Sequence, residues 1–233
     1  ADGFNLDGVN SVEPHPDTCY VQDQTDSSGR SGIDNQLARI WTDLEPLVGE
    51  ATQALVHGAI NEGKFLLMIE LEGVDDLMND DNITVHVLRG RLKPNIGTKD
   101  LIAPDQTFYA DEKFPSSKVE NVQIVDGFIE AGPVSFVVPI EILDANFELP
   151  VRRGKVRIQI SPDGSFTGLV GGFITASEFL GELLNTGAKT EAELVSPFFE
   201  ENTDRNRVDG YCTDFSAAFG FSATTAFVVR QTI

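Results

Sequence analysis

Basic residues are scarce in this sequence of 233 residues. Its 17 lysines and arginines stand against 37 aspartates and glutamates, which gives a formal net charge of −20. A surface of this charge repels phosphate backbones and anionic membranes, so we expect no nucleic acid among the partners. Cations are the partners that it attracts. The same acidity also keeps an extracellular protein soluble without any ligand.

Long apolar runs are missing as well. The longest covers residues 65–69, far short of the roughly 18 apolar residues that a membrane-spanning helix needs. We therefore expect no transmembrane segment, and any lipid anchor would lie upstream of Ala1. Because the first residue is alanine and not methionine, we expect either that a leader was removed or that the sequence was trimmed at its start.

Tryptophan, tyrosine and cysteine are rare, whereas phenylalanine is common. One Trp and three Tyr accompany 16 Phe, which indicates a packed interior because Phe has no polar tip to satisfy. The two cysteines, Cys19 and Cys212, lie among polar residues. They are either two buried thiols or one bridge between the ends of the chain. We favour the bridge, which implies export to the periplasm, the outer surface or the extracellular space.

The pattern along the chain predicts one domain over residues 1–233. Residues 1–35 form an acidic arm with too few apolar residues to fold alone, so we expect it to be pinned to the C-terminal region. Residues 36–62 are expected to be helical. Asp34 is the predicted N-cap of the first helix, and Pro46 is its predicted end. The predicted buried face of this helix consists of Leu37, Ile40, Trp41 and Leu44.

Period-two alternation begins at residue 64 and recurs to the end of the chain. Residues 64–72, 82–89, 122–125, 128–129, 134–140, 141–149, 155–160, 165–174 and 215–229 are the expected strands. Asp126-Gly127 predicts a hairpin turn. Two short helices are expected near 176–199, with Pro197 ending the second. The predicted fold is mainly β: an antiparallel β-sandwich or a barrel-like, jelly-roll-type sheet with short helices at one end.

Three segments have the composition of calcium-binding loops, since calcium takes oxygens from Asp, Asn, carbonyls and water on sharply turning loops. They are residues 3–8, residues 23–29 with the two positions 34–35, and residues 202–210. Each alone is weak, because Asx-Gly turns form without ions. A bridge between the cysteines would gather them into one structural calcium site. The candidate ligands are Asn5, Asp7, Asp23, Asp26, Asp34, Asn35, Asp204, Asn206 and Asp209.

Catalytic signatures are weak. His15 lies between two prolines, His57 lies in a predicted helix, and His86 is expected on the exposed face of a strand; no HExxH, GxSxG or CxxC motif accompanies them. Paired carboxylates are the better enzymatic route, because a β-sandwich glycosidase needs two facing acids. The strand-borne candidates are Glu70, Glu72, Glu130, Glu141 and Glu148.

Short motifs near both ends of the sequence resemble those of known protein groups. The opening run at residues 2–8, then Cys19, the segment Gly-Ile-Asp-Asn-Gln at residues 32–36 and the late Gly-Tyr-Cys at residues 210–212 resemble exported lipoproteins of Gram-negative bacteria. That likeness implies no activity. The opening Asp/Asn/Gly loops are similar to thrombospondin type 3 and dockerin calcium loops, which implies calcium. They depart from those loops at Gly3, where the pattern has Asp.

We therefore expect an exported, non-catalytic protein that is supported by calcium and binds or scaffolds another macromolecule of the cell envelope or surface. One alternative is a carbohydrate-active protein, either a binding module or a hydrolase. Another is a subunit of a surface assembly.

Overall fold

Strands dominate the structure. The computed structural model describes residues 2–13, 15–16, 19–48, 51–97, 101–142, 145–161 and 165–230. Strands cover about twice as many of the described residues as helices do. The prediction of a mainly β, antiparallel fold is therefore confirmed.

Ten strands and four helices form in the described part of the chain. The strands are β1 (Leu67–Glu72), β2 (Asn79–Arg91), β3 (Gln106–Ala110), β4 (Ser117–Val125), β5 (Phe128–Ile142), β6 (Ala145–Ile160), β7 (Phe166–Thr175), β8 (Arg205–Val208), β9 (Tyr211–Ala223) and β10 (Ala226–Val229). The helices are α1 (Gln36–Val48), α2 (Ala51–Asn61), α3 (Ala176–Asn185) and α4 (Lys189–Glu201).

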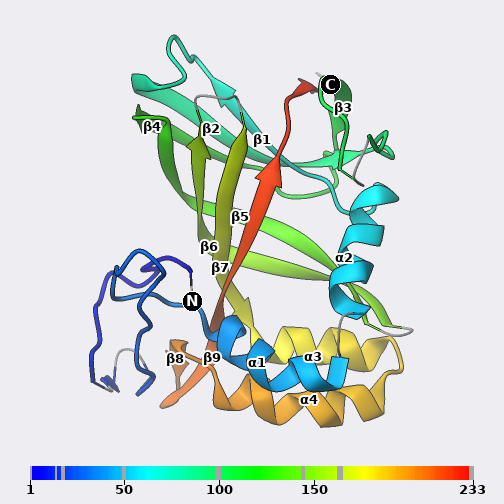
Figure 1. Cartoon of the computed structure of the whole chain (residues 1–233). Coiled ribbons are helices and arrows are strands. Elements are labelled where there is room, and N and C mark those ends of the chain that lie inside the picture. The colour runs from blue at the N-terminus through cyan, green and yellow to red at the C-terminus, as the bar shows by residue number, and fades with distance from the viewer. Residues whose placement is uncertain are drawn as a thin grey trace.

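All ten strands belong to one large sheet that does not close into a barrel. The order is β10-β3-β2-β4-β5-β6-β7-β9-β8, and β1 pairs with β2 off this path. Every pairing of these strands is antiparallel except that of β10 with β3. Helices α1, α3 and α4 gather at one end of the sheet, as expected, and the N-terminal arm lies beside that end (Figure 1).

Strand β2 is covered on both faces because its alternating side chains enter two different cores. Ile83, Val85 and Val87 lie in the main core, which also takes in α1, α3 and α4. Leu88 points to the opposite face. There it joins a second core made of Leu66, Met68, Leu88, Phe108 and Ala110, against which Ile102 and Val228 also pack.

Phenylalanines fill the main core under the helices. Phe147, Phe179, Phe199 and Phe215 contact one another in a row, with centroid distances of 5.7, 4.3 and 5.0 Å. Each is at most 6% exposed. The bias toward Phe in the composition is thus explained by packing, as expected.

Helix ends differ from the predictions. Helix α1 continues past Pro46 to Val48, and α4 contains Pro197 in its interior instead of ending there. An interior proline removes one backbone hydrogen bond and crowds the carbonyl four residues earlier. Buried Phe199 nevertheless holds the last turn of α4 in the main core. Trp41 is 36% exposed, so it does not belong to the buried face of α1. The Leu44 side chain lies outside the described residues.

Most predicted strands were right in place but often wrong in length, and β3 was not predicted at all. Strand β5 joins two predicted strands. The predicted strand over residues 141–149 is instead the end of β5 and the start of β6, which runs on through residues 155–160. The turn at Asp126-Gly127 is confirmed, since both residues have positive φ, 51° and 74°, and Val125 pairs with Phe128 across it.

Candidate functional site

The disulfide between Cys19 and Cys212 is present and confirms the predicted bridge. It joins residues 193 positions apart, with a Cα–Cα distance of 6.1 Å. The arm is thereby fixed beside the hairpin of β8 and β9.

Charge holds the arm as well, because it lies against basic side chains of the sheet. Arg205 of β8 forms an ion pair with Asp7 at 3.2 Å, and the Asp7 side chain is 3% exposed. Lys155 of β6 donates to the carbonyl of Asn5 at 3.2 Å. The net acidic arm thus packs against basic side chains of β6 and β8.

One aromatic side chain anchors the same contact. Phe4 is 0% exposed, and its backbone pairs with Asp34. The Arg157 guanidinium lies 4.7 Å from the centre of the Phe4 ring and donates to the carbonyl of Gly3. The arm is therefore a built part of the fold, although it is poor in apolar residues.

The first predicted calcium loop closes on itself. The Asn5 Oδ1 atom accepts from the Gly8 amide at 2.6 Å, and the Asp7 Oδ1 atom accepts from the Val9 amide at 2.7 Å. These are Asx turns, which need no ion.

The second predicted loop is closed mainly by Asp26. Its carboxylate accepts from the Ser28 hydroxyl and from the backbone and guanidinium of Arg30. These bonds hold the pKa of Asp26 well below its usual range against the effect of burial. Asp23 instead reaches Ser11, whose amide donates to its carboxylate.

The helix-capping role that was predicted for Asp34 belongs to its neighbour Asn35. Asn35 is the residue before α1, and its Oδ1 atom accepts from the Ala38 amide at 3.2 Å, so Asn35 caps the helix. The prediction of Asp34 as N-cap was wrong. Asp34 turns back to the arm and accepts from the Leu6 and Asp7 amides at 2.7 and 3.2 Å.

The third predicted calcium loop is in fact a hairpin. Residues 205–208 form β8, and Asp209 and Gly210, with φ of 50° and 92°, make its turn into β9. Asn206 donates to the Thr213 hydroxyl at 3.0 Å. The tight turn and the cross-strand bond hold this segment in place without an ion.

Asp204, just before β8, is buried and bonded to β9. Its two carboxylate oxygens accept from the amide of Ser216 at 2.9 Å and from the hydroxyl of Ser216 at 2.5 Å. The same Ser216 hydroxyl accepts from the amide of Gln36, the first residue of α1, at 3.0 Å. A hydrogen-bonded chain thus links α1 through Ser216 to Asp204.

Four of the predicted ligands lie near enough for the charges of three to act on the fourth, Asp34. We call these four the acidic corner: Asp7, Asp23, Asp34 and Asp204. Burial first, and the neighbouring charge of Asp7 second, raise the pKa of Asp34 to about 7. The charges of Asp204 and Asp23 act on it in the same direction. Burial also raises the pKa of Asp204 to about 7, against the bonds from Ser216. Two carboxyls therefore titrate near neutral pH.

Two unsatisfied buried oxygens belong to residues whose backbone is bonded to this region. Within the described part of the chain, the Ser11 hydroxyl and the Gln36 Oε1 atom are buried without a hydrogen-bond partner. Ser11 is bonded through its amide to Asp23, and Gln36 through its amide to Ser216. Unpaired buried oxygens are rare and costly, so each is a potential ligand or water acceptor.

No family model, curated protein or solved structure matches this chain.

Within the described residues, no three His, Cys, Asp or Glu side chains stand close enough to hold a metal ion. Calcium, however, also takes backbone carbonyls and waters as ligands. None of the helices in the described residues is long and apolar enough to cross a membrane.

His86 is buried, not exposed as predicted from the alternation of β2. It is 5% exposed, and its Nε2 atom lies 2.9 Å from a carboxylate oxygen of Glu72. It is covered because β1 pairs with β2 on one side, where Glu70 faces His86, and β4 pairs on the other.

The carboxylates nominated for glycosidase chemistry form ion pairs with basic side chains. Glu70 pairs with Arg230, Glu130 with Arg157 and Glu148 with Arg89. The Glu141 side chain lies outside the described residues.

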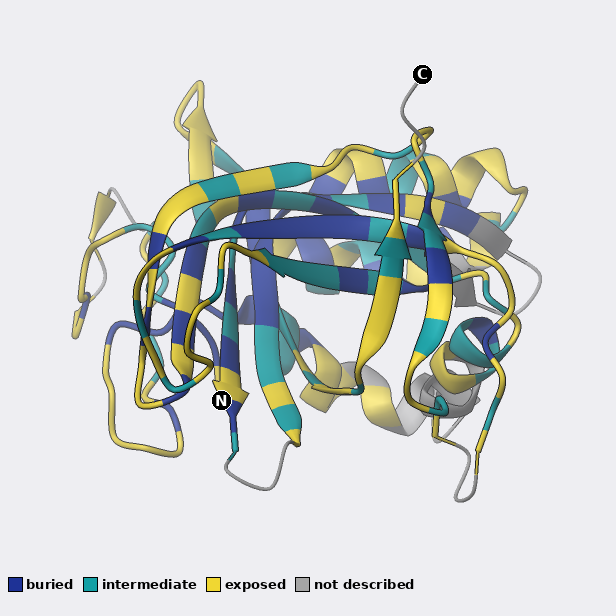
Figure 2. Ribbon diagram, turned by 90° about the horizontal axis from the view of Figure 1, so that it is seen from above, coloured by how far each residue is buried: buried dark blue, intermediate teal, exposed yellow. Residues whose placement is uncertain are grey.

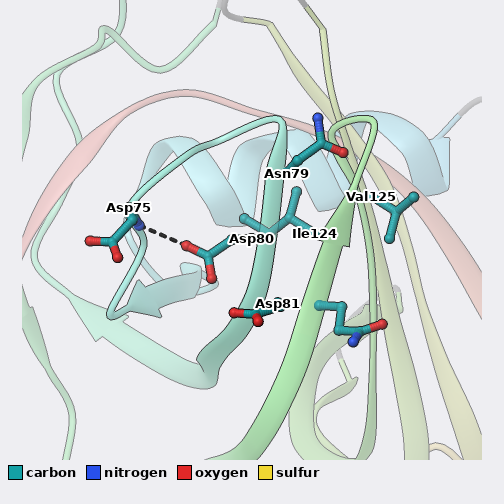
Figure 3. A pocket seen from close by; sticks show the side chains of 7 residues that line it. Asp75, Asn79, Asp80, Asp81, Ile124 and Val125 are labelled. Atoms are coloured by element: carbon teal, nitrogen blue, oxygen red, sulfur yellow. Dashed lines mark hydrogen bonds between the residues drawn. The ribbon is translucent and has the colours of Figure 1, made fainter.

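Sequence reasoning missed an acidic hollow at the loop between β1 and β2. It has a volume of about 420 Å³ and is lined by Asp75, Asn79, Asp80, Asp81, Gln123, Ile124 and Val125 (Figure 3). Four aspartates within seven residues, at positions 75, 76, 80 and 81, were the sequence feature that could have indicated it. Asp80 accepts from the Asp75 and Asn82 amides at 2.7 and 3.0 Å, and these bonds lower its pKa. Its carboxylate shapes the loop.

Proposed function

We propose that the chain is an exported, non-catalytic domain that binds or scaffolds another envelope macromolecule and is stabilised by calcium at the acidic corner. The observation that carries the calcium part is the burial of Asp34 and Asp204 next to two further carboxylates. Above neutral pH these two buried groups carry like charges, whereas Arg205 pairs with Asp7. A divalent cation would neutralise them.

The donor set supports calcium over softer metals. The acidic corner offers carboxylate oxygens, and the unpaired Ser11 hydroxyl and Gln36 amide oxygen are further oxygen donors on residues bonded to this region. Oxygen donors favour calcium and magnesium over zinc. The disulfide supports export, because such bonds persist in oxidising compartments.

Calcium binding is tested by thermal unfolding at pH 8 with 1 mM calcium and with a chelator. At a calcium concentration a hundred times the Kd, the stabilisation is about 2.7 kcal/mol. This amounts to a rise in Tm of roughly 5–10 °C for a chain of this size. Asp34→Asn and Asp204→Asn should abolish the rise, whereas Glu112→Gln, on the exposed surface, should keep it. An unchanged Tm and no metal by elemental analysis would refute the calcium part.

The surface for the macromolecular partner is proposed at the hairpin of β8 and β9. Two of the three tyrosines are exposed there: Tyr20 by 60% and Tyr211 by 79%, with Val208 exposed by 50% and paired with Tyr211. The Arg207 guanidinium lies 5.9 Å from the Tyr20 ring. Exposed Tyr and Arg are enriched where proteins bind one another. Pull-downs from envelope extract should lose their specific bands with Tyr20→Ala and Tyr211→Ala.

The same two tyrosines favour carbohydrate binding as the second candidate, because exposed aromatic rings are platforms on which sugar rings stack. A glycan array distinguishes the two functions. Binding to a defined glycan that is lost in Tyr211→Ala and kept in Trp41→Ala would replace the protein partner by a sugar.

A further inference from the structure

Strand β10 ends the sheet with an apolar and exposed edge. It pairs with β3 over Ala226–Val229, and β3 is its one strand partner within the described residues. Phe227 is 62% and Val229 is 36% exposed, whereas Val228 between them packs against the second core. Figure 2 shows this strand, which leads to the C label, mostly in the colour of exposed residues.

The opposite edge of the sheet is protected. Strand β8 is equally short, but three of its four residues are Arg205, Asn206 and Arg207. The arm lies against it, since Arg205 pairs with Asp7 and Arg207 donates to the carbonyl of Pro16. Proteins guard open edges with charges or with covering segments.

Strand β10 carries no charge of its own, and within the described residues no strand other than β3 pairs with it. Its four residues, Ala-Phe-Val-Val, contain no charge and no proline. The next residue, Arg230, is bound to Glu70 of β1 and so does not shield the edge. An unguarded apolar edge of this kind marks a site that pairs with another strand.

We propose that β10 pairs antiparallel with β10 of a second copy of this chain, so that one sheet continues across a two-fold axis. Centred on Val228, this register sets Phe227 opposite Val229 of the other copy. Because these two residues lie on one face of the strand, the dimer joins four exposed apolar side chains in one cluster.

Charge favours a second copy at this place. Each copy carries a net charge of −20, so most faces of two copies repel each other. The β10 edge contains no acidic residue, and the proposed register sets Arg230 opposite Ala226 of the other copy. Like charges therefore do not meet across the axis. Since the contact is small and the copies repel, the dimer is weak, with a Kd on the order of micromolar or higher.

Sedimentation velocity of the full chain from 1 μM to 1 mM tests the dimer, at about 150 mM salt to screen the repulsion. The wild type should shift from monomer to dimer. Phe227→Lys and Val229→Lys should raise the Kd at least tenfold with an unchanged Tm, because both side chains are exposed. Val208→Lys at the protected edge is the matched control and should keep the dimer. Amide hydrogen exchange over residues 226–229 should slow as the concentration rises.

A wild type that remains monomeric at 1 mM overturns the proposal, as does a dimer that survives both lysine variants. If Val208→Lys and Phe227→Lys each abolish association, the copies join edge β10 to edge β8, and the two-fold pairing is wrong. Calcium and partner binding are read by separate assays, so the outcome here is independent of the proposed function.

Discussion

Raising the pH from 4 to 8 is expected to destabilise the fold through Asp34 and Asp204. Burial and neighbouring carboxylates raise both folded-state pKa values from 3.8 to about 7. The folded state thus holds these protons more tightly than the unfolded state does. Stability from these groups is complete below pH 4 and is lost progressively as the pH rises toward 7.

The magnitude follows from the size of the shift. About three pKa units at 1.36 kcal/mol each correspond to roughly 4 kcal/mol for one group. The two carboxyls act on a shared set of neighbours, so their effects do not add fully. We therefore expect a loss of about 4 kcal/mol in the free energy of unfolding between pH 4.5 and pH 8. The low pKa of Asp26 acts in the opposite direction and only below pH 4.

Urea unfolding at several pH values, with a chelator present, measures this slope. Asp34→Asn is the cleaner variant, because an amide oxygen can still accept from the Leu6 and Asp7 amides. It should match the wild type at pH 4.5 and exceed its stability by about 2–4 kcal/mol at pH 8. A stability that is flat or rising from pH 5 to pH 8, or an Asp34→Asn slope equal to that of the wild type, would refute the reasoning.

Three further predictions concern the contacts around the arm. Replacing Cys19 and Cys212 by serine should cost about 5 kcal/mol in the chain-entropy model for so long a loop, as measured by urea unfolding, and a cost below 1 kcal/mol would contradict it. Ser216→Ala should cost about 2–4 kcal/mol, because it leaves buried Asp204 without its hydroxyl donor; a calorimetric Tm equal to that of the wild type would argue against this. Phe4→Ala should cost about 3–5 kcal/mol and expose residues 2–35 to limited proteolysis, and an arm that stays protected would show that Phe4 is not its anchor.

Local signals predicted the parts of the fold that local chemistry decides. Asp126-Gly127 forms its turn because both residues take positive φ, whatever the surroundings. The alternation of Ile83, Val85 and Val87 placed these residues correctly in the core. His86 was misplaced because its environment depends on β1 and β4, which pair with β2 from elsewhere in the chain.

The sequence predicted which segments meet at the candidate site, but not which partner each acidic side chain would have. The cysteines showed that the arm and residues 202–210 would meet, and they do. Composition could not show which acids would close turns, pair with arginine or remain buried without a counter-charge. Asp26 binds Arg30, whereas Asp34 faces three other carboxylates. That difference arises from the packing of β6, β8 and the arm, which no single segment encodes.

The balance of charge at the arm explains why an acidic, apolar-poor segment is ordered at all. Arg157 and Lys155 hold its backbone carbonyls, and Arg205 holds Asp7. These cations neutralise the side of the arm that lies against the sheet but do not bond to Asp34 or Asp204. The contact is therefore stabilised on one side, whereas the carboxylates on the other side repel one another.

Protons relieve the repulsion between these carboxylates below neutral pH, and a divalent cation would relieve it above. For that reason calcium should stabilise the chain more at pH 8 than at pH 5.5, and an equal effect at the two pH values would place the ion elsewhere.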